Sequence, residues 1–301
     1  VKTTAYTDMK MGTAGLRKKS KVVLQENYLE NFVQSVFDAI GGVKGLTFIL
    51  GGDGRYYNKT AIQKIMKMAA ANGMKKMIVG QNGFISTPAS SHILLTNKAD
   101  GGFVLSASHN PGGINGDFGI KYAVASGGQC PTSVSDKIYE ISKTISEYKI
   151  SDEPDVDLSK LGVQKLEEME IEVIDPVKDY VEMMENIFDF SAIKKLFANG
   201  FTMVFDAMNA VTGPYARKIF EEILGAKQGT VLNYIPLEDF GGLHPDPNLI
   251  YAKTLVDLMY SDKAPDFGAA NDGDGDRNMI LGKKFFVTPS DSLAILTDNY
   301  K

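Results

Sequence analysis

The alternation of short apolar runs with amphipathic helices is the feature that most constrains the fold of this chain. Residues 46–50 and 77–80 are typical of buried strands, whereas residues 28–40 have apolar side chains at helical spacing. Such alternation predicts an α/β architecture with a mainly parallel, right-handed sheet. Ligands of these sheets bind outside the carboxyl ends of the strands. The loops that follow the predicted strands are therefore where we look first for functional residues.

The same pattern restarts in the second part of the chain. Residues 202–206 are a predicted strand that ends in a carboxylate, residues 213–224 a helix, and residues 267–270 a strand of small residues. A length of 301 residues fits two ordinary domains. We place the boundary near Phe190, with one domain over residues 1–190 and another over residues 191–301.

Composition excludes several classes of protein. The net charge is -5, from 32 basic and 37 acidic residues, which argues against general nucleic-acid binding because that requires a basic face. Cys130 is the single cysteine, so no intramolecular disulfide is possible and a reducing compartment is indicated. We find neither an apolar run like a signal peptide nor an apolar stretch long enough to span a membrane. These features predict a cytoplasmic globular protein without membrane insertion.

A reactive-looking loop follows the apolar run at residues 102–105. It reads Ser-Ala-Ser-His-Asn-Pro-Gly-Gly over residues 106–113 and is called the serine loop below. Its proline and glycines predict a compact turn whose amides could face an anion. Ser108 lacks the G-x-S-x-G elbow of hydrolases, and its neighbour His109 is expected to point elsewhere, which disfavours a Ser-His base pair. From spacing alone, a nucleophile and a tight turn with a solvated serine both remain open.

A second unusual loop, the acidic loop, covers residues 272–277. Asp272, Asp274 and Asp276 can converge on one hard cation such as Mg²⁺, and the glycines between them allow tight folding. A calcium EF-hand is excluded because Arg277 stands where glycine is needed and Lys283 where glutamate is needed. An exposed acidic turn is the alternative. The apolar strand before the loop and the arginine after it favour the metal site.

The remaining loops and motifs give weaker evidence of function. Residues 11–19 combine two glycines, a threonine and a basic cluster, so they either turn toward an anion or form a solvated surface turn. There is no Walker sequence and no G-x-G-x-x-G. Asp-Phe-Gly occurs three times without a His-Arg-Asp loop, so it is not a kinase signature here.

Taken together, these motifs resemble those of the α-D-phosphohexomutase superfamily. The stretches that carry the resemblance are residues 12–17, 106–113, 115–121 and 272–277. Residues 80–89 and 236–248 are more similar to eukaryotic-type phosphoglucomutases and parafusin-like relatives than to bacterial phosphomannomutases. The resemblance implies tandem phosphoglucomutase-type domains, each a mixed, mainly parallel sheet flanked by helices.

The resemblance also implies roles for individual residues. Ser108 would be a phosphoserine, and Asp272, Asp274 and Asp276 would bind Mg²⁺ together with its phosphate. Arg17 and Arg277 would stabilise charge on the transferring group, and Lys121 and His109 are candidates for proton transfer. The implied substrate-binding residues are Thr13, Arg17, Ser108, Lys121 and Arg277. Alternatively, Asp276 and Arg277 form a structural ion pair.

The implied reaction interconverts glucose 1-phosphate and glucose 6-phosphate through glucose 1,6-bisphosphate, which also serves as activator. The expected partner is a hexose phosphate, with no nucleic acid, and the expected state is a monomer. Members of the family have about four domains, and we find neither the sugar-binding loop of the third nor the phosphate-binding loop of the fourth. We therefore expect the first two domains of a longer protein, with weak or no turnover alone. Two alternatives remain: phosphomannomutase or another phosphohexomutase, and a parafusin-like phosphoprotein of signalling or exocytosis.

Overall fold

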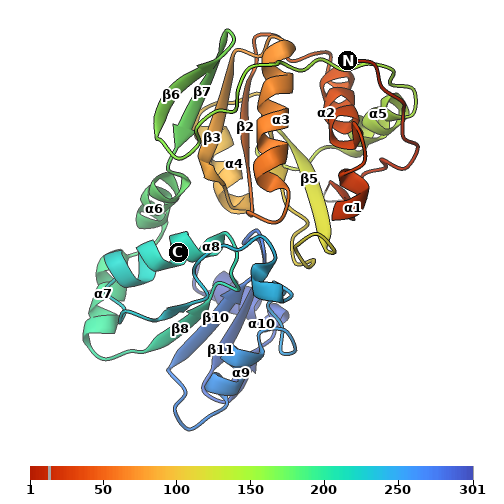
Figure 1. The fold of residues 1–301 in the computed structure, drawn as a ribbon. Helices are drawn as coiled ribbons and strands as arrows, with labels where there is room; N and C mark the ends of the chain where they lie inside the picture. Colours follow the sequence, from red (N-terminus) through yellow and green to blue (C-terminus); the bar gives the residue numbers. More distant parts are fainter. Residues whose placement is uncertain (13–14, 301) are drawn as a thin grey trace. The chain divides into compact units, whose positions relative to one another are not determined.

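The computed structural model describes residues 1–12 and 15–300, which divide into two compact units (Figure 1). The first unit comprises Val1–Ala107 and Gly112–Pro176. The second comprises Val177–Lys301 together with the tetrapeptide Ser108–Pro111, whose contacts group it there. The serine loop therefore begins and ends in the first unit and has its central residues in the second.

The division between the two units lies earlier in the sequence than the boundary expected near Phe190. Helix α6 (Pro176–Ile187) follows the division, and the ring of Tyr180 meets the ring of Tyr215 edge-on with centroids 5.4 Å apart. This aromatic contact lies within the second unit and ties α6 to it. The sequence placed α6 in the first domain because nothing in its apolar spacing tells which unit it packs against.

The first unit contains a seven-stranded sheet and five helices among its described residues. In chain order the elements are β1 (Leu16–Lys19), α1 (Ser20–Val23), α2 (Tyr28–Ala39), β2 (Thr47–Gly52), α3 (Asn58–Ala71), β3 (Lys76–Phe84), α4 (Thr87–Thr96), β4 (Gly101–Leu105), β5 (Asp117–Val124), α5 (Thr132–Ser142), β6 (Gly162–Leu166) and β7 (Met169–Ile174). The strand order is β1-β5-β4-β2-β3-β7-β6. Parallel pairing occupies the centre, from β4 through β2 and β3 to β7, and antiparallel pairing occupies both edges.

Helices cover both faces of this sheet. In Figure 1, α2 and α3 lie on one face and α4 lies behind the other. Phe103 of β4 contacts Phe37 of α2 and the rings of Phe48 and Tyr122, all at centroid distances near 6 Å. These side chains have at most 6% of their surface exposed. The core beneath α2 therefore fixes the register of β4, the strand that leads into the serine loop.

The second unit repeats the plan with a smaller sheet. Its elements are α6, α7 (Phe190–Ala198), β8 (Met203–Asp206), α8 (Thr212–Ala216), the π-helix η1 (Arg217–Ile223), β9 (Val231–Leu232), the 3₁₀ turn η2 (Phe240–Gly242), α9 (Lys253–Met259), β10 (Phe267–Asn271), β11 (Asn278–Gly282), β12 (Phe285–Val287) and α10 (Pro289–Asp298). The strand order is β12-β11-β10-β8-β9, parallel from β10 to β9 and antiparallel from β10 to β12. Two cores lie on opposite faces of this sheet: Leu255 and Met259 of α9 pack on one, and Phe205 and Phe220 on the other.

The expected tandem α/β fold with mixed, helix-flanked sheets is confirmed. Parallel pairing is restricted to the centre of the first sheet and to the β10-β8-β9 side of the second. The strand predicted at residues 77–80 is longer than expected and continues as β3 to Phe84. Helix α4 is capped by Ser86, whose hydroxyl accepts a hydrogen bond from the amide of Ala89 at 3.3 Å. No helix in the described part of the chain has the length and apolarity needed to cross a membrane.

Candidate functional site

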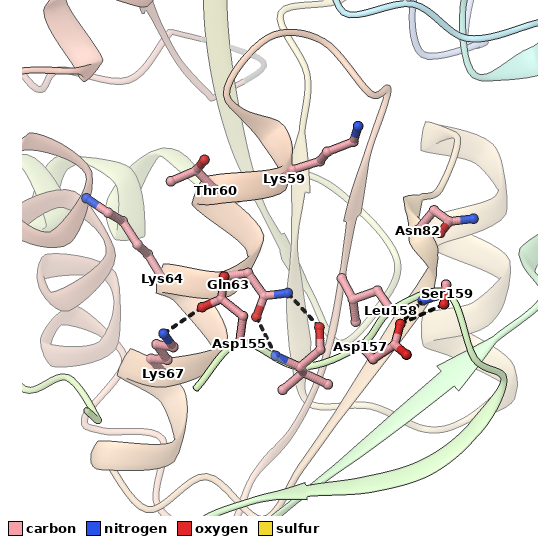
Figure 2. Close-up of a pocket in the computed structure, with 11 residues that line it drawn as sticks. Lys59, Thr60, Gln63, Lys64, Lys67, Asn82, Asp155, Asp157, Leu158 and Ser159 are labelled. Carbon is pink, nitrogen blue, oxygen red and sulfur yellow. Dashed lines mark hydrogen bonds and ion pairs between the residues drawn. The ribbon is translucent and has the colours of Figure 1, made fainter. Parts of the chain in front are cut away.

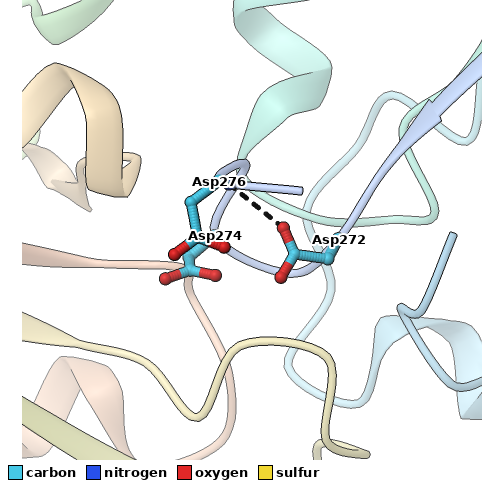
Figure 3. Close-up of side chains that lie close together, drawn as sticks. All are labelled: Asp272, Asp274 and Asp276. Atoms are coloured by element: carbon cyan, nitrogen blue, oxygen red, sulfur yellow. Dashed lines mark hydrogen bonds between the residues drawn. The ribbon is translucent and has the colours of Figure 1, made fainter. Parts of the chain in front are cut away.

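The acidic loop is the connection between two antiparallel strands. β10 and β11 pair from Phe267 opposite Gly282 to Asn271 opposite Asn278, and the six loop residues close this hairpin. Gly275 has a φ of 79°, in the left-handed region that glycine adopts without strain. The three aspartates of the loop each place one carboxylate oxygen within 4.8 Å of the others (Figure 3). Asp272 and Asp274 are fully buried, whereas Asp276 is exposed.

Asp272 is held through both of its carboxylate oxygens. Oδ1 accepts hydrogen bonds from the amides of Gly275, Asp276 and Arg277, each at 3.1 Å. Oδ2 accepts a hydrogen bond from the hydroxyl of Ser108 at 2.7 Å. Burial, and then the charges of Asp274 and Asp276, raise the pKa of Asp272 to about 7, against the hydrogen bonds that lower it. Three converging carboxylates, two of them buried, form a set of oxygen donors suited to a hard divalent cation, which would relieve their mutual repulsion.

Ser108 lies at the centre of the serine loop in an unusual conformation. Its φ is 56°, which costs a residue other than glycine roughly 1–2 kcal/mol. Its side chain is 1% exposed, and the bond to Asp272 joins residues 164 positions apart in the sequence. Ser106, the other serine of the loop, instead donates to Asp53. The structure therefore separates the two serines: Ser108 is the one that meets the acidic loop.

His109 lies between Ser108 and Arg277. Its Nδ1 is 3.5 Å from the Ser108 hydroxyl and also contacts Nη1 of Arg277. A guanidinium can only donate, so this contact requires Nδ1 to accept and places the proton of a neutral ring on Nε2. The expected divergence of Ser108 and His109 was overstated, although 3.5 Å is a weak contact beside the 2.7 Å bond to Asp272.

The ion pair between Asp276 and Arg277 is marginal. The charged atoms are 4.0 Å apart, and the two side chains are 34% and 50% exposed. An exposed pair at this distance contributes little. Contact with the His109 ring is the shorter interaction of the Arg277 guanidinium.

Arg17 and Lys121 lie on neighbouring strands of the first unit. Arg17 of β1 is directly opposite Gly119 of β5, and Lys121 follows two residues later, so both side chains leave the same face of the sheet. The ammonium group of Lys121 donates to the hydroxyl of Thr87, at the start of α4, at 3.3 Å. Lys121 lies near the start of the serine loop, because it is opposite Val104 of β4, two residues before Ser106. Thr13 lies outside the described residues.

Sequence analysis missed a buried polar network beside the serine loop. It joins Asp53, Arg55 and Asn58 to Ser106, and the side chains of Asp53 and Arg55 are 0% exposed. The available signal was the turn at residues 51–55, which places two opposite charges directly after an apolar strand.

A separate cavity of about 550 Å³ lies along α3 in the first unit (Figure 2). It is lined by three lysines of α3 and by residues 155–159. Two of these lysines already pair with carboxylates, Lys64 with Glu30 and Lys67 with Asp155, each at 2.6 Å. Of the expected functional residues that the structure describes, none lines this cavity.

In a comparison with known proteins, each of the two units matches the model of a protein-family domain. Residues 8–149 match the model of phosphoglucomutase/phosphomannomutase α/β/α domain I, and residues 178–284 match that of domain II. The chain belongs to the phosphoglucomutase/phosphomannomutase family. It therefore falls within the α-D-phosphohexomutase superfamily, as its motifs predicted.

Individual relatives agree with this assignment. The chain is 59% identical over 301 residues to a phosphoglucomutase of Rhizobium radiobacter, covering 100% of this chain and 56% of the relative. It is 52% identical over 318 residues to a cytoplasmic phosphoglucomutase of Populus tremula, with coverage of 99% and 55%. The structure of the exocytosis-sensitive phosphoprotein pp63/parafusin, a phosphoglucomutase of Paramecium, matches with a TM-score of 0.96 and 46% identity, covering 99% of this chain and 57% of that one. The chain thus spans about half the length of the curated relatives it matches.

Proposed function

We propose that this chain carries the phosphoryl-donating half of a phosphoglucomutase. The complete protein would interconvert glucose 1-phosphate and glucose 6-phosphate through glucose 1,6-bisphosphate. The observation that carries the proposal is the 2.7 Å hydrogen bond from the Ser108 hydroxyl to Asp272, inside a cluster of three carboxylates. Relatives named phosphoglucomutase at 52–59% identity support the same reaction.

In this proposal Ser108 alternates between a free hydroxyl and a phosphate ester. The sugar hydroxyl attacks the phosphorus of phosphorylated Ser108, and the bond from phosphorus to Oγ breaks. The sugar proton passes to a base, and Oγ takes up a proton to become a hydroxyl again. Lys121 and His109 are the candidates for this proton transfer, and the Nδ1 contact with Arg277 leaves His109 less able to accept. The second half of the cycle runs in reverse after the bisphosphate has reoriented.

Asp272, Asp274 and Asp276 would hold Mg²⁺ beside the phosphoserine. As an ester, Oγ of Ser108 has no proton to donate, so Oδ2 of Asp272 would face a phosphate of like charge. A divalent cation bound there would neutralise this charge and stabilise the transferring phosphoryl group. Arg17 and Arg277 would add positive charge around the same group, and Thr13, with Lys121, would bind the substrate.

A coupled assay tests this function in the full-length protein that carries the chain. It contains glucose 1-phosphate, Mg²⁺ and glucose 1,6-bisphosphate, and it compares wild type with Ser108→Ala. Ser90→Ala is a matched control, because the Ser90 side chain is also buried and donates to the carbonyl of Thr87 at 2.6 Å. We expect turnover to fall to background in Ser108→Ala alone. Wild-type turnover in that variant would refute the phosphoserine role.

The same assay tests two alternative functions. The matched family includes phosphomannomutases, so mannose 1-phosphate serves as the competing substrate, and a higher kcat/KM for it would reassign the sugar. A parafusin-like role in signalling or exocytosis is the other alternative, and its relative is itself described as a phosphoglucomutase. Absence of turnover on both sugars with Ser108 phosphorylated would favour that role. A monomer in the cytoplasm remains our expectation, in line with the relative from Populus tremula that is named cytoplasmic.

A further inference from the structure

The serine loop begins beside a buried ion pair that the proposed chemistry does not use. Asp53 and Arg55 follow β2, and their side chains pair at 2.8 Å with no exposed surface. Nε of Arg55 also donates to both carboxylate oxygens of Asp53, at 2.9 and 3.1 Å. Burying two charges is costly unless their geometry and hydrogen bonds compensate.

Asp53 and Arg55 form hydrogen bonds with the strands on either side of the serine loop. Oδ2 of Asp53 accepts the Ser106 hydroxyl at 2.6 Å, and the Asp53 amide donates to the carbonyl of Leu105 at 3.1 Å. On the other side, Nη1 of Arg55 donates to the carbonyl of Asp117, the first residue of β5, at 2.9 Å. The pair thus connects the last residue of β4, the first residue of the loop and the first residue of the strand that follows it.

Further contacts restrict the same segment. Asn58 donates to the Leu105 carbonyl at 3.0 Å and to Asp53 at 3.3 Å. Gly119 lies so close to the loop that an added Cβ would be 2.0 Å from the Ser106 carbonyl oxygen. At the far end of the loop, the buried Ser20 hydroxyl donates to the Gly113 carbonyl at 2.9 Å. Both ends of the loop are therefore fixed by the first unit.

We propose that the Asp53–Arg55 pair is a positioning device for Ser108. By holding the hydroxyl of Ser106 it fixes the backbone two residues before Ser108 and maintains the left-handed conformation of Ser108, which sterics disfavour. Ser106, Asp53 and Arg55 are positioning residues in this scheme, since they act through the loop. The inference rests on the proposed phosphoserine function and extends it to residues outside the acidic loop.

The experiment uses Ser106→Ala in the full-length protein, because this variant removes one hydroxyl and leaves the ion pair in place. The measurements are kcat and KM for glucose 1-phosphate and the rate at which glucose 1,6-bisphosphate phosphorylates Ser108. Ser35→Ala is the matched control, since the Ser35 side chain is also 0% exposed and donates at 2.7 Å to a carbonyl, that of Asn31 within α2. Ser106→Thr restores the hydroxyl.

We expect Ser106→Ala to lower kcat and the phosphorylation rate by about tenfold to a hundredfold, the scale of a small misplacement of a reacting group. KM should stay within about twofold, because no substrate contact is removed. Ser106→Thr should recover most of the loss, and thermal unfolding should shift no more than in Ser35→Ala. An active wild type with unchanged kcat in Ser106→Ala would overturn the positioning role, as would an equal fall of kcat in Ser35→Ala. An inactive wild type would instead overturn the proposed function.

Discussion

At the scale of single residues, Asp272 shows how one carboxylate orders two loops. One carboxylate oxygen accepts hydrogen bonds from three backbone amides of its own hairpin, and the other accepts a hydrogen bond from the hydroxyl of Ser108. Burial beside Asp274 and Asp276 disfavours its charged form. A cation would reverse that preference. The metal-free protein should therefore carry a measurable proton at Asp272.

This proton predicts a pH dependence of stability in the metal-free protein. The pKa of Asp272 is raised from its usual 3.8 to about 7, so between these values the folded state binds more protons than the unfolded state. Stability contributed by this group is therefore full below pH 4 and falls as the pH rises toward 7. Urea unfolding with a chelator present, from pH 4 to 7, measures the slope. Asp272→Asn should flatten it, and an identical slope in wild type and variant would contradict the assignment.

Gly15 offers a second test at the same scale. It has a φ of 101°, and an added Cβ would lie 2.4 Å from the carbonyl oxygen of Ile120, on the strand that carries Lys121. Gly41 has a similar φ of 88° with no atom within 4 Å of its added Cβ. Gly41→Ala should cost roughly 1 kcal/mol of unfolding free energy from strain alone, and Gly15→Ala roughly 2–4 kcal/mol because overpacking adds to the strain. Equal costs in the two variants would show that β1 does not pack against β5 as described.

At the scale of elements, the carboxyl end of β2 organises the edge of the first sheet. The turn after it holds the Asp53–Arg55 pair, and that pair reaches both β4 and β5. A buried charge left without its partner is strongly destabilising. This turn should therefore matter for folding as well as for the serine loop.

Arg55→Met tests the contribution of the pair to stability. We expect a loss of roughly 3–5 kcal/mol of unfolding free energy, because Asp53 keeps its charge and loses its buried partner. Lys253→Met is the control: Lys253 pairs with Asp257 along α9, but both side chains are more than half exposed. That change should alter stability by less than about 0.5 kcal/mol. Chemical denaturation of both variants supplies the comparison, and similar losses would mean that the Asp53–Arg55 pair is not desolvated.

The same elements show how far sequence alone could go. Apolar spacing sufficed for α2, β2, β4 and β10, because their buried faces leave a regular pattern. Sequence analysis also identified the acidic loop, because its three aspartates stand at alternate positions within five residues. It did not find the network of Asp53 and Ser106, since residues 53 positions apart meet only after β2 and β4 have paired. Nor did it anticipate the edge hairpin of β6 and β7, where the outer strand is largely exposed.

At the scale of the whole molecule, the boundary between the two units decides which residues each unit needs in order to fold. The sequence prediction put the boundary at Phe190, and the contacts put it at Pro176. The family models leave residues 150–177 between them and begin the second domain at residue 178. We propose that α6 belongs to the second folding unit because Tyr180 packs on Tyr215.

Two fragments distinguish these boundaries. A fragment of residues 177–301 should unfold cooperatively on heating, whereas a fragment of residues 191–301 should lose stability because Tyr215 loses its aromatic neighbour. Tyr180→Ala in the longer fragment is the control, and it should reproduce much of the loss. Circular dichroism melting provides the readout. Equal melting of the two fragments would support the boundary at Phe190.

In the proposed reaction, Ser108 carries the phosphoryl group beside the acidic loop. The most direct measurement is peptide mapping by mass spectrometry after the full-length protein is incubated with glucose 1,6-bisphosphate and Mg²⁺. We predict one phosphorylated residue, Ser108, and loss of that phosphate when excess glucose 6-phosphate is added. Asp274→Asn should slow both steps because it removes one of the three converging carboxylates. Phosphate found on Ser106 or elsewhere, or a phosphate on Ser108 that the sugar cannot remove, would contradict the proposed role of Ser108.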